Sequence, residues 1–298
     1  MRILILSRNP ALYSTNKIAV AARRKGHHVR IIDHVNCDLV VDNRKNVVLY
    51  NGEHISGYDA VIPRIGSSVT SYGAMVVRHF ESMGMYSTLS SDALLKTRDK
   101  MSCLQILSNA FLPVPKTAIT NNYYSFSNIV RYVGKFPIII KLLQGTHGLG
   151  VIKADDFKIS ESILEAFFKT KQKVLLQEFV AEASGEDVRA FVVGNRVVAA
   201  MMRKAKAGEF RSNLHRGASS QKIHLTEEEE RVALKATATM GLSIAGVDIL
   251  RSSRGPLIME VNASPGLEGI EGATKINIAK EIIEFAERSF KKEKGKYV

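Results

Sequence analysis

The sequence predicts an α/β region followed by an α+β region, and three observations carry this prediction. Over the first ninety residues, short apolar runs alternate with amphipathic stretches, which is typical of βαβ units with a mostly parallel sheet. A glycine-rich segment then joins two strand-like runs within 137–153. Paired strand signals at 188–202 and 246–261 indicate antiparallel hairpins. We expect three parts, spanning 1–93, 94–175 and 176–298.

The first part is predicted to be Rossmann-like, because its strand and helix signals alternate. Its first strand is followed by Ser7-Arg8-Asn9-Pro10, so the G-x-G-x-x-G fingerprint of dinucleotide-binding proteins is absent. The sheet alone therefore says nothing about function. The expected elements are strands at 2–7, 29–33 and 59–62 and helices at 14–25 and 73–83.

At the boundary between the first and second parts, one long helix is expected from Asp92, a favourable N-cap, to Asn109. In the third part, Thr226 and Glu229 form a capping box for a helix that ends at Gly241. Between them, the basic segment 203–222 is predicted to be a long loop of functional importance. The remaining expected elements are helices at 127–133 and 160–169, a helix from about 278, and strands at 137–142, 151–153, 173–179, 188–193, 196–202, 246–250 and 257–261.

Length and composition are those of a globular protein with a substantial core. The chain has 298 residues, of which 45% are hydrophobic and 24% are charged. Cys37 and Cys103 are too few for a disulfide framework and too far apart for a metal-binding pair. The apolar runs are strand-sized, and the first residues lack the pattern of a signal peptide. We therefore expect a cytoplasmic protein with no membrane segment.

The net charge of +13 is concentrated in two segments. Residues 203–222 carry a net charge of +5 and residues 288–298 a net charge of +4. Aromatic residues make up 7% of the chain, tryptophan is absent, and no RNA-recognition or zinc-finger pattern occurs. This distribution argues against sequence-specific nucleic-acid recognition as the main function.

Three oxygen-bearing side chains near the end of the chain predict a metal site. Glu260 and Asn262 are two residues apart on a predicted strand, so they share one face. If the hairpin turns about residue 254, Asp248 lies opposite Glu260. Two facing carboxylates and an amide suit Mg²⁺ or Mn²⁺. The alternative is a solvated hairpin face, but both strands are otherwise apolar.

A glycine-rich loop follows Lys141, which ends an apolar strand. Three glycines within 145–150 would let backbone N–H groups approach phosphate oxygens, and the lysine would add a positive charge. The loop joins two strands and the lysine precedes it, so this is not a Walker loop. Glycine-rich turns are common, but together with a divalent metal site they indicate nucleoside triphosphate chemistry.

Other charged residues are weaker candidates, each with an ordinary structural alternative. Lys100 fits a solvated helix lysine as well as a phosphate ligand, and Glu178 lies where a hinge could contact a purine or ribose. Asp187 and Arg189 could simply pair with each other. The loop residues Arg203, Arg211, Asn213 and His215 could be a solvated surface or could capture phosphate or carboxylate groups.

The order of these residues resembles the ATP-grasp superfamily of carboxylate–amine ligases. Three strings are similar to the RimK-type alpha-L-glutamate ligases, which extend the C-terminus of a small-subunit ribosomal protein with glutamates. They are PRIG at 63–66, FRSNLHRG at 210–217 and MEVNASPGLEG at 259–269. The similarity covers essentially the whole chain, and the last two strings are long enough to be specific.

This resemblance implies that two α+β subdomains hold ATP behind a Rossmann-like pre-ATP-grasp domain. Asp248, Glu260 and Asn262 would hold two Mg²⁺ or Mn²⁺ ions. We further expect the 203–222 segment to fold over the site, where Arg203 and Arg211 would offset oxyanion charge during catalysis. The implied nucleotide-binding residues are Lys100, Lys141, Gly145, Gly148, Gly150, Gln177, Glu178, Phe179, Val180, Asp187, Arg211, Ser212 and Asn213. Our candidate substrate residues are Arg64, Arg189, His215 and Ser264.

The expected reaction is the ATP-dependent addition of L-glutamate to a C-terminal carboxylate through an acyl phosphate. Such chemistry requires positioning and charge neutralisation more than a protein nucleophile. The expected partners are L-glutamate and an acceptor protein in a homo-oligomeric enzyme. Two alternatives stay open: a related ligase that acts on a small molecule or a carrier protein, and a non-catalytic ribosome- or RNA-associated protein.

Overall fold

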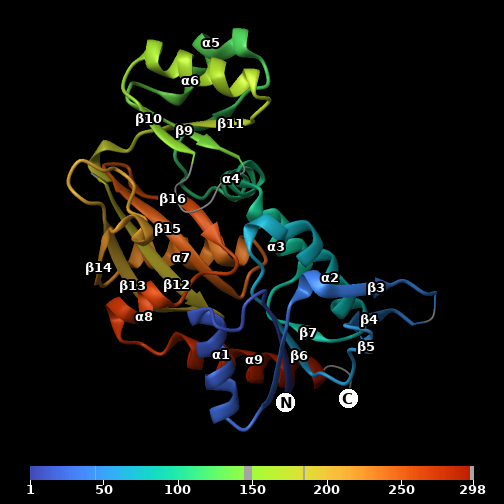
Figure 1. Ribbon diagram of the computed structural model, residues 1–298. Coiled ribbons are helices and arrows are strands. Elements are labelled where there is room, and N and C mark those ends of the chain that lie inside the picture. Colours follow the sequence, from blue (N-terminus) through green and yellow to red (C-terminus); the bar gives the residue numbers. More distant parts are fainter. Residues whose placement is uncertain (44, 144–149, 184, 296–298) are drawn as a thin grey trace.

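The computed structural model describes residues 1–43, 45–143, 150–183 and 185–295, which form four sheets (Figure 1). The N-terminal sheet has the order β2-β1-β6-β7, and every pair in it is parallel, as predicted. Other parts of the chain cover both faces of this sheet, which is why its strands are apolar. The elements of this region are β1 (Arg2–Leu6), α1 (Tyr13–Arg24), β2 (His28–Ile32), β6 (Ala60–Pro63), α2 (Thr70–Ser82) and β7 (Tyr86–Ser87).

A small antiparallel sheet within this region was not predicted from the sequence. It comprises β3 (Cys37–Val40), β4 (Val47–Tyr50) and β5 (Glu53–His54). These strands are short and partly polar, so their hydrophobic alternation is weak. Short 3-10 helices lie at His34–Asn36, Ser67–Val69, Tyr123–Ser125, Ala181–Ala183 and Leu214–Arg216.

The predicted long helix is divided into α3 (Ser91–Arg98) and α4 (Lys100–Asn109). Asp99 between them has an extended backbone, with φ −82° and ψ 107°. Its carboxylate accepts a hydrogen bond from the Ser102 backbone N–H at 2.9 Å. Asp99 is therefore the N-cap of α4, and the prediction of one continuous helix was wrong because this capping residue stands in the middle of the apolar pattern.

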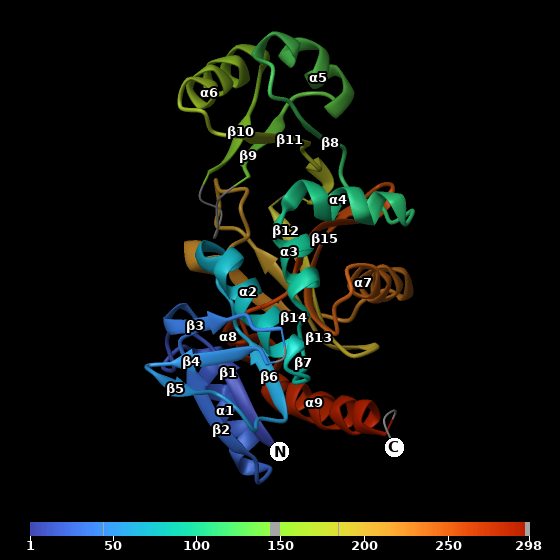
Figure 2. The same cartoon turned by 90° about the vertical axis from the view of Figure 1, so that its right-hand side faces the viewer.

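The central region is an antiparallel sheet of order β10-β9-β11-β8, with α5 and α6 on one side (Figure 2). Its apolar core consists of residues from this region alone, among them Phe126, Ile140 and Leu164. The figures show it projecting away from the rest of the molecule beyond α4. Its elements are β8 (Thr117–Ile119), α5 (Phe126–Val133), β9 (Ile138–Leu142), β10 (Val151–Ala154), α6 (Phe157–Lys169) and β11 (Val174–Glu178).

The C-terminal region is an antiparallel sheet of order β14-β13-β12-β15-β16. Its core is continuous with that of the N-terminal region, because Phe80 and Leu6 lie in the same cluster as Val232 and Ile258. The last helix also packs against α1. The elements are β12 (Glu186–Val193), β13 (Arg196–Lys204), β14 (Ser219–Lys222), α7 (Glu227–Thr239), β15 (Ile244–Ser252), β16 (Gly255–Asn262), α8 (Glu268–Thr274) and α9 (Ile278–Lys294).

The prediction of a loop over 203–222 was wrong at both ends. β13 continues through Arg203 and Lys204, and β14 pairs with it over 219–222. The glycines and serines that suggested a loop lie partly in an edge strand, whose exposed positions tolerate polar residues. No helix in the described parts of the chain is long and apolar enough to span a membrane.

Candidate nucleotide and metal site

One face of the C-terminal sheet is divided into an apolar half and a polar half. Alternate residues of β12 share this face, and Phe191 and Val193 belong to the core that includes residues of α8 and α9. Asp187 and Arg189 are the preceding residues on the same face. The register places further polar residues beside them on three neighbouring strands: Arg203, Asp248, Glu260 and Asn262.

Three buried charged residues and the half-buried Arg189 form a continuous chain across this polar half. Arg203 donates two hydrogen bonds to Asp187, both at 2.6 Å, and its Nη2 lies 2.9 Å from an Asp248 oxygen. Arg189 donates two hydrogen bonds to Asp248, both at 2.7 Å. The alternative in which Asp187 pairs with Arg189 is therefore wrong. Each arginine instead bonds an aspartate on the neighbouring strand.

Burial and ion pairing shift the pKa values of the two aspartates in opposite directions. Burial raises the pKa of Asp187, and this effect outweighs the charge of Arg203 and a hydrogen bond from Ser212. Burial also acts on Asp248, but the charges of Arg189 and Arg203 hold its pKa below the usual range. Asp248 is consequently an ionised carboxylate in a site with little exposure to water.

The predicted opposition of Asp248 and Glu260 is observed, with the turn centred between residues 253 and 254. The turn pairs Ser252 with Gly255, which would place residue 259 opposite Asp248. An irregularity between Asp248 and Ile249 shifts the register by one residue and brings Glu260 into that place. This bulge puts the two carboxylates on one face.

The three side chains fit a hard divalent cation by their donor chemistry. Glu260 is exposed, Asn262 is half-buried, and neither receives a side-chain hydrogen bond from the described residues. Arg189 and Arg203 occupy three of the roughly four lone-pair sites of Asp248. Within the described residues, no three His, Cys, Asp or Glu side chains could hold a metal ion. The third ligand would therefore be the Asn262 amide.

Lys141 lies at the end of β9, on the central sheet. Its ammonium donates a 2.6 Å hydrogen bond to Gln177, whose amide in turn donates to Thr117 at 2.8 Å. Burial lowers the pKa of Lys141 to about 8, while the negative charges of Glu260 and Asp248 act in the opposite direction. Lys141 is therefore within electrostatic range of the carboxylates on the other sheet.

Lys100 and Gly150 lie close to Lys141. The Lys100 ammonium donates to the Leu143 carbonyl at 3.1 Å, and its charge helps to lower the pKa of Lys141. Gly150 has φ +71°, and a Cβ there would lie 2.5 Å from a Leu142 methyl group, so glycine is required. Gly145 and Gly148 lie outside the described residues.

Glu178, Phe179 and Val180 connect the central sheet to the C-terminal sheet. The Glu178 carboxylate accepts hydrogen bonds from the Lys116 backbone N–H at 2.7 Å and from Arg254 at 2.6 Å. The Lys153 ammonium lies 5.4 Å from the centre of the Phe179 ring. Val180 is buried in a small cluster with Leu257.

The connection between β13 and β14 carries the remaining predicted residues. Arg211 forms a two-point pair with Glu209 at 2.9 and 2.6 Å and donates to the Val151 carbonyl at 3.3 Å, which joins this connection to β10. The Arg211 pair lowers the Glu209 pKa to about 2. Asn213 precedes the 3-10 helix Leu214–Arg216 without capping it, and His215 is exposed.

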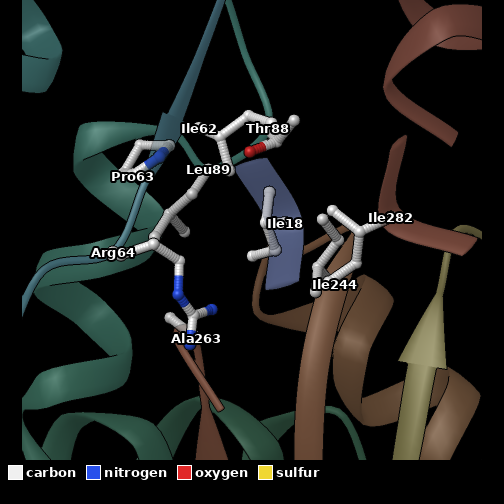
Figure 3. A pocket seen from close by; sticks show the side chains of 9 residues that line it. All are labelled: Ile18, Ile62, Pro63, Arg64, Thr88, Leu89, Ile244, Ala263 and Ile282. Carbon is white, nitrogen blue, oxygen red and sulfur yellow. The ribbon is translucent and has the colours of Figure 1, made fainter. Parts of the chain in front are cut away.

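Arg64 and Ser264 lie together, whereas Arg189 is bound to Asp248. Arg64 follows β6 and extends toward Ala263 (Figure 3). It donates to the Pro265 carbonyl at 2.7 Å. The cavity beside it measures about 10 Å³, room for about one water molecule. Arg98 also lies here, and sequence reasoning missed it because it resembles an ordinary basic residue in the last turn of a helix.

Residues 97–286 match the family described as RimK-like ATP-grasp domain, and residues 1–94 match the RimK PreATP-grasp domain. The chain belongs to the RimK-like ATP-grasp family. It is 50% identical over 291 residues to a probable alpha-L-glutamate ligase of Cellvibrio japonicus, covering 98% of this chain and 97% of that one. It is 47% identical over 289 residues to a probable alpha-L-glutamate ligase of Nitrosococcus oceani, covering 97% and 96%.

Solved structures of lower identity confirm the fold of this RimK-like chain. The ATP-grasp ligase PsnB with minimal precursor, Mg and ADP is similar with a TM-score of 0.75 at 20% identity, covering 97% of this chain and 98% of that one. D-alanine–D-alanine ligase from Bacillus anthracis with ATP gives a TM-score of 0.71 at 19% identity, covering 98% and 99%. The expected family, ATP-grasp fold and ATP-dependent ligase class are thus confirmed.

Proposed function

We propose that this protein joins the amine of L-glutamate to the C-terminal carboxylate of an acceptor protein. The supporting observation is that the Lys141 ammonium lies within electrostatic range of the Asp248 and Glu260 carboxylates across two sheets. Positive charge on one side and metal-binding oxygens on the other match the needs of a metal-bound triphosphate. The names of the similar ligases support glutamate as the amine substrate.

The metal-binding role belongs to Asp248, Glu260 and Asn262, for two Mg²⁺ or Mn²⁺ ions. Such ions neutralise charge on the β- and γ-phosphates during transfer. Arg203 is a positioning residue in this proposal, because its donors hold Asp187 and Asp248 in place.

The nucleotide would lie between the two sheets. Lys100 and Lys141 supply charge to the phosphates, and Gly150 with the glycines before it lets the backbone approach them. The remaining contacts would come from the connection between the sheets and from the β12–β14 side: Gln177, Glu178, Phe179, Val180, Asp187, Arg211, Ser212 and Asn213.

The reaction requires no protein nucleophile. A carboxylate oxygen of the acceptor attacks the γ-phosphorus of ATP, and the bond from this phosphorus to the β-phosphate oxygen breaks. ADP departs, and the acceptor carboxylate has become an acyl phosphate. The glutamate amine then attacks the acyl carbon, an amide forms, and phosphate leaves with loss of the amine proton. Arg211 would offset the oxyanion charge after releasing Glu209, and its segment would shield the acyl phosphate from water.

The acceptor in this proposal is a small-subunit ribosomal protein in the cytoplasm, and the enzyme is a homo-oligomer. The net charge of +13 favours an acidic amino acid and an acidic growing tail. A small-molecule or carrier-protein acceptor is the main alternative. His215 and Arg189 stay assigned to the substrate side, where Arg189 would act through Asp248.

Mass spectrometry of a cell lysate incubated with enzyme, ATP and labelled glutamate tests this function. We expect mass increments of one or more glutamates on one small ribosomal protein. Mass increments on a metabolite would show that the acceptor is a small molecule instead of a ribosomal protein. The absence of mass increments on any molecule would refute the proposal.

A matched pair of variants tests the metal assignment. Glu260→Gln should reduce glutamate-dependent ADP release at least about 100-fold. Glu268→Gln, at an exposed position outside the β15–β16 hairpin, should not change this release. Salt-dependent RNA binding without ATP turnover would instead support the non-catalytic alternative.

A further inference from the structure

Two arginines lie together between the N-terminal sheet and the connection from β16 to α8. Arg64 follows β6, and Arg98 is the last residue of α3. The Arg64 guanidinium donates to the carbonyls of Pro265 at 2.7 Å and Ser264 at 3.4 Å. The Arg98 guanidinium donates at 2.6 Å to the carbonyl of Ile65, the residue next to Arg64. Backbone carbonyls therefore hold both side chains in place.

Neither guanidinium has a carboxylate ion-pair partner among the residues that the structure describes. Burial, together with the charge of Arg98, lowers the pKa of Arg64 to about 10, so both groups stay charged at neutral pH. The nearest acidic influence is Glu260, whose charge acts on Arg98. Two half-buried like charges without a counter-ion are unfavourable unless an anion joins them.

Two buried polar atoms in this group also lack partners. They are Arg98 Nε and Ser264 Oγ, both enclosed by protein and without a hydrogen bond to any described residue. Buried polar groups are nearly always hydrogen-bonded, so such exceptions require an explanation. Guanidinium N–H groups and a hydroxyl are all donors suited to a carboxylate, and a guanidinium can bind one at two points.

We propose that Arg64, Arg98 and Ser264 bind a carboxylate of the free amino-acid substrate that does not itself react. The inference rests on the proposed function. Because α3, which ends at Arg98, contacts β16, which carries Glu260, this carboxylate site borders the β15–β16 hairpin, where phosphoryl transfer would take place. The small apolar cavity on the other side of Arg64 is lined by neither Arg98 nor Ser264, so the carboxylate would lie on the side of the two arginines that faces β16. Holding the carboxylate here would direct the amine toward the acyl phosphate.

Kinetics with Arg98→Gln, Ser264→Ala and the matched control Lys96→Gln test this site. Lys96 is an exposed cation on the same helix. We expect the KM for glutamate to rise about 10- to 100-fold in Arg98→Gln and about 3- to 10-fold in Ser264→Ala. The KM for ATP should change less than twofold in both, and Lys96→Gln should match the wild type. Arg98→Lys keeps the positive charge but cannot bind a carboxylate at two points, so its KM for glutamate should lie between those of the wild type and Arg98→Gln.

The two monoamides of glutamate identify the carboxylate that is bound. Wild-type enzyme should discriminate strongly against either the α-amide or the γ-amide, and Arg98→Gln should lose that discrimination. Unchanged discrimination, or parallel increases in the KM values for ATP and glutamate, would overturn the site. Melting temperatures of all variants exclude misfolding as the cause.

Equilibrium binding of glutarate separates this inference from the proposed function. If wild-type enzyme releases no ADP with glutamate, the proposed function fails. Glutarate binding that weakens at least about 10-fold in Arg98→Gln but not in Lys96→Gln would still support the site. Equal binding by wild type and Arg98→Gln, or no binding by either, contradicts it.

Discussion

The central sheet and the C-terminal sheet contribute to one site but are built differently. The central sheet has a core of its own, whereas the C-terminal sheet shares its core with the N-terminal region. The charges differ as well: Lys141 is bonded to a neutral amide, while Asp248 is bonded to two arginines. The C-terminal sheet thus fixes its charges internally, and the central sheet leaves a positive charge for a ligand.

Arg203→Met should have the largest effect, because it leaves Asp187 and Asp248 facing each other in a buried site. We expect a loss of about 3–5 kcal/mol in the free energy of unfolding. The neighbouring Lys204→Met is the control, since Lys204 forms an exposed pair with Glu186 and should cost less than about 1 kcal/mol. Urea denaturation measures both, and equal losses would show that the buried chain of charges does not stabilise this sheet.

Lys141→Met should weaken nucleotide binding while the fold stays intact. The loss of one charge-assisted contact to phosphate predicts an increase of about 10- to 100-fold in Kd for a non-hydrolysable ATP analogue. Calorimetry measures the affinity, with the more distant Lys135→Met as the control. An unchanged Kd would mean that the central sheet does not supply charge to the phosphates.

The affinity of the free protein for nucleotide should also depend on the protonation of Lys141. Burial lowers the pKa of Lys141 to about 8, so the ammonium dominates below that pH and is lost as the pH rises through it. Affinity should fall by up to about 10-fold between pH 7 and pH 9. Lys141→Arg, which remains charged, should give a flatter profile over the same interval. Identical profiles for the two proteins would assign the pH dependence to another group.

Gln177→Glu should give the smallest effect of these variants. It would pair Lys141 with an opposite charge, as the charges of the C-terminal sheet are already paired. A carboxylate beside Lys141 would neutralise its charge and raise its pKa, so we expect a several-fold weaker affinity for the ATP analogue at pH 7. Gln221→Glu, on the edge strand of the other sheet, is the matched control. Tighter binding in Gln177→Glu would reverse the proposed difference between the sheets.

Much of the fold followed from local patterns. Apolar runs predicted the parallel sheet, and the capping box at Thr226 and Glu229 is present at the start of α7. The break at Asp99 was missed because an N-cap residue inside an apolar pattern reads as part of one helix. The bulge that brings Glu260 opposite Asp248 was also hidden, although the predicted pairing was correct. Bulges depend on contacts that the strand sequence does not encode locally.

The sequence by itself determined which chemical groups are available: an oxygen-rich C-terminal hairpin, a lysine before a glycine loop, and strings that resemble one ligase family. Only the tertiary structure decided their partners. Arg203 rather than Arg189 bonds Asp187, Gln177 holds Lys141, and Arg98 lies beside Arg64. The physical reason is that hydrogen bonds and ion pairs act over a few ångströms between strands and helices far apart in sequence. Residue spacing along the chain fixes which face a side chain shares, but not which charge it meets across that face.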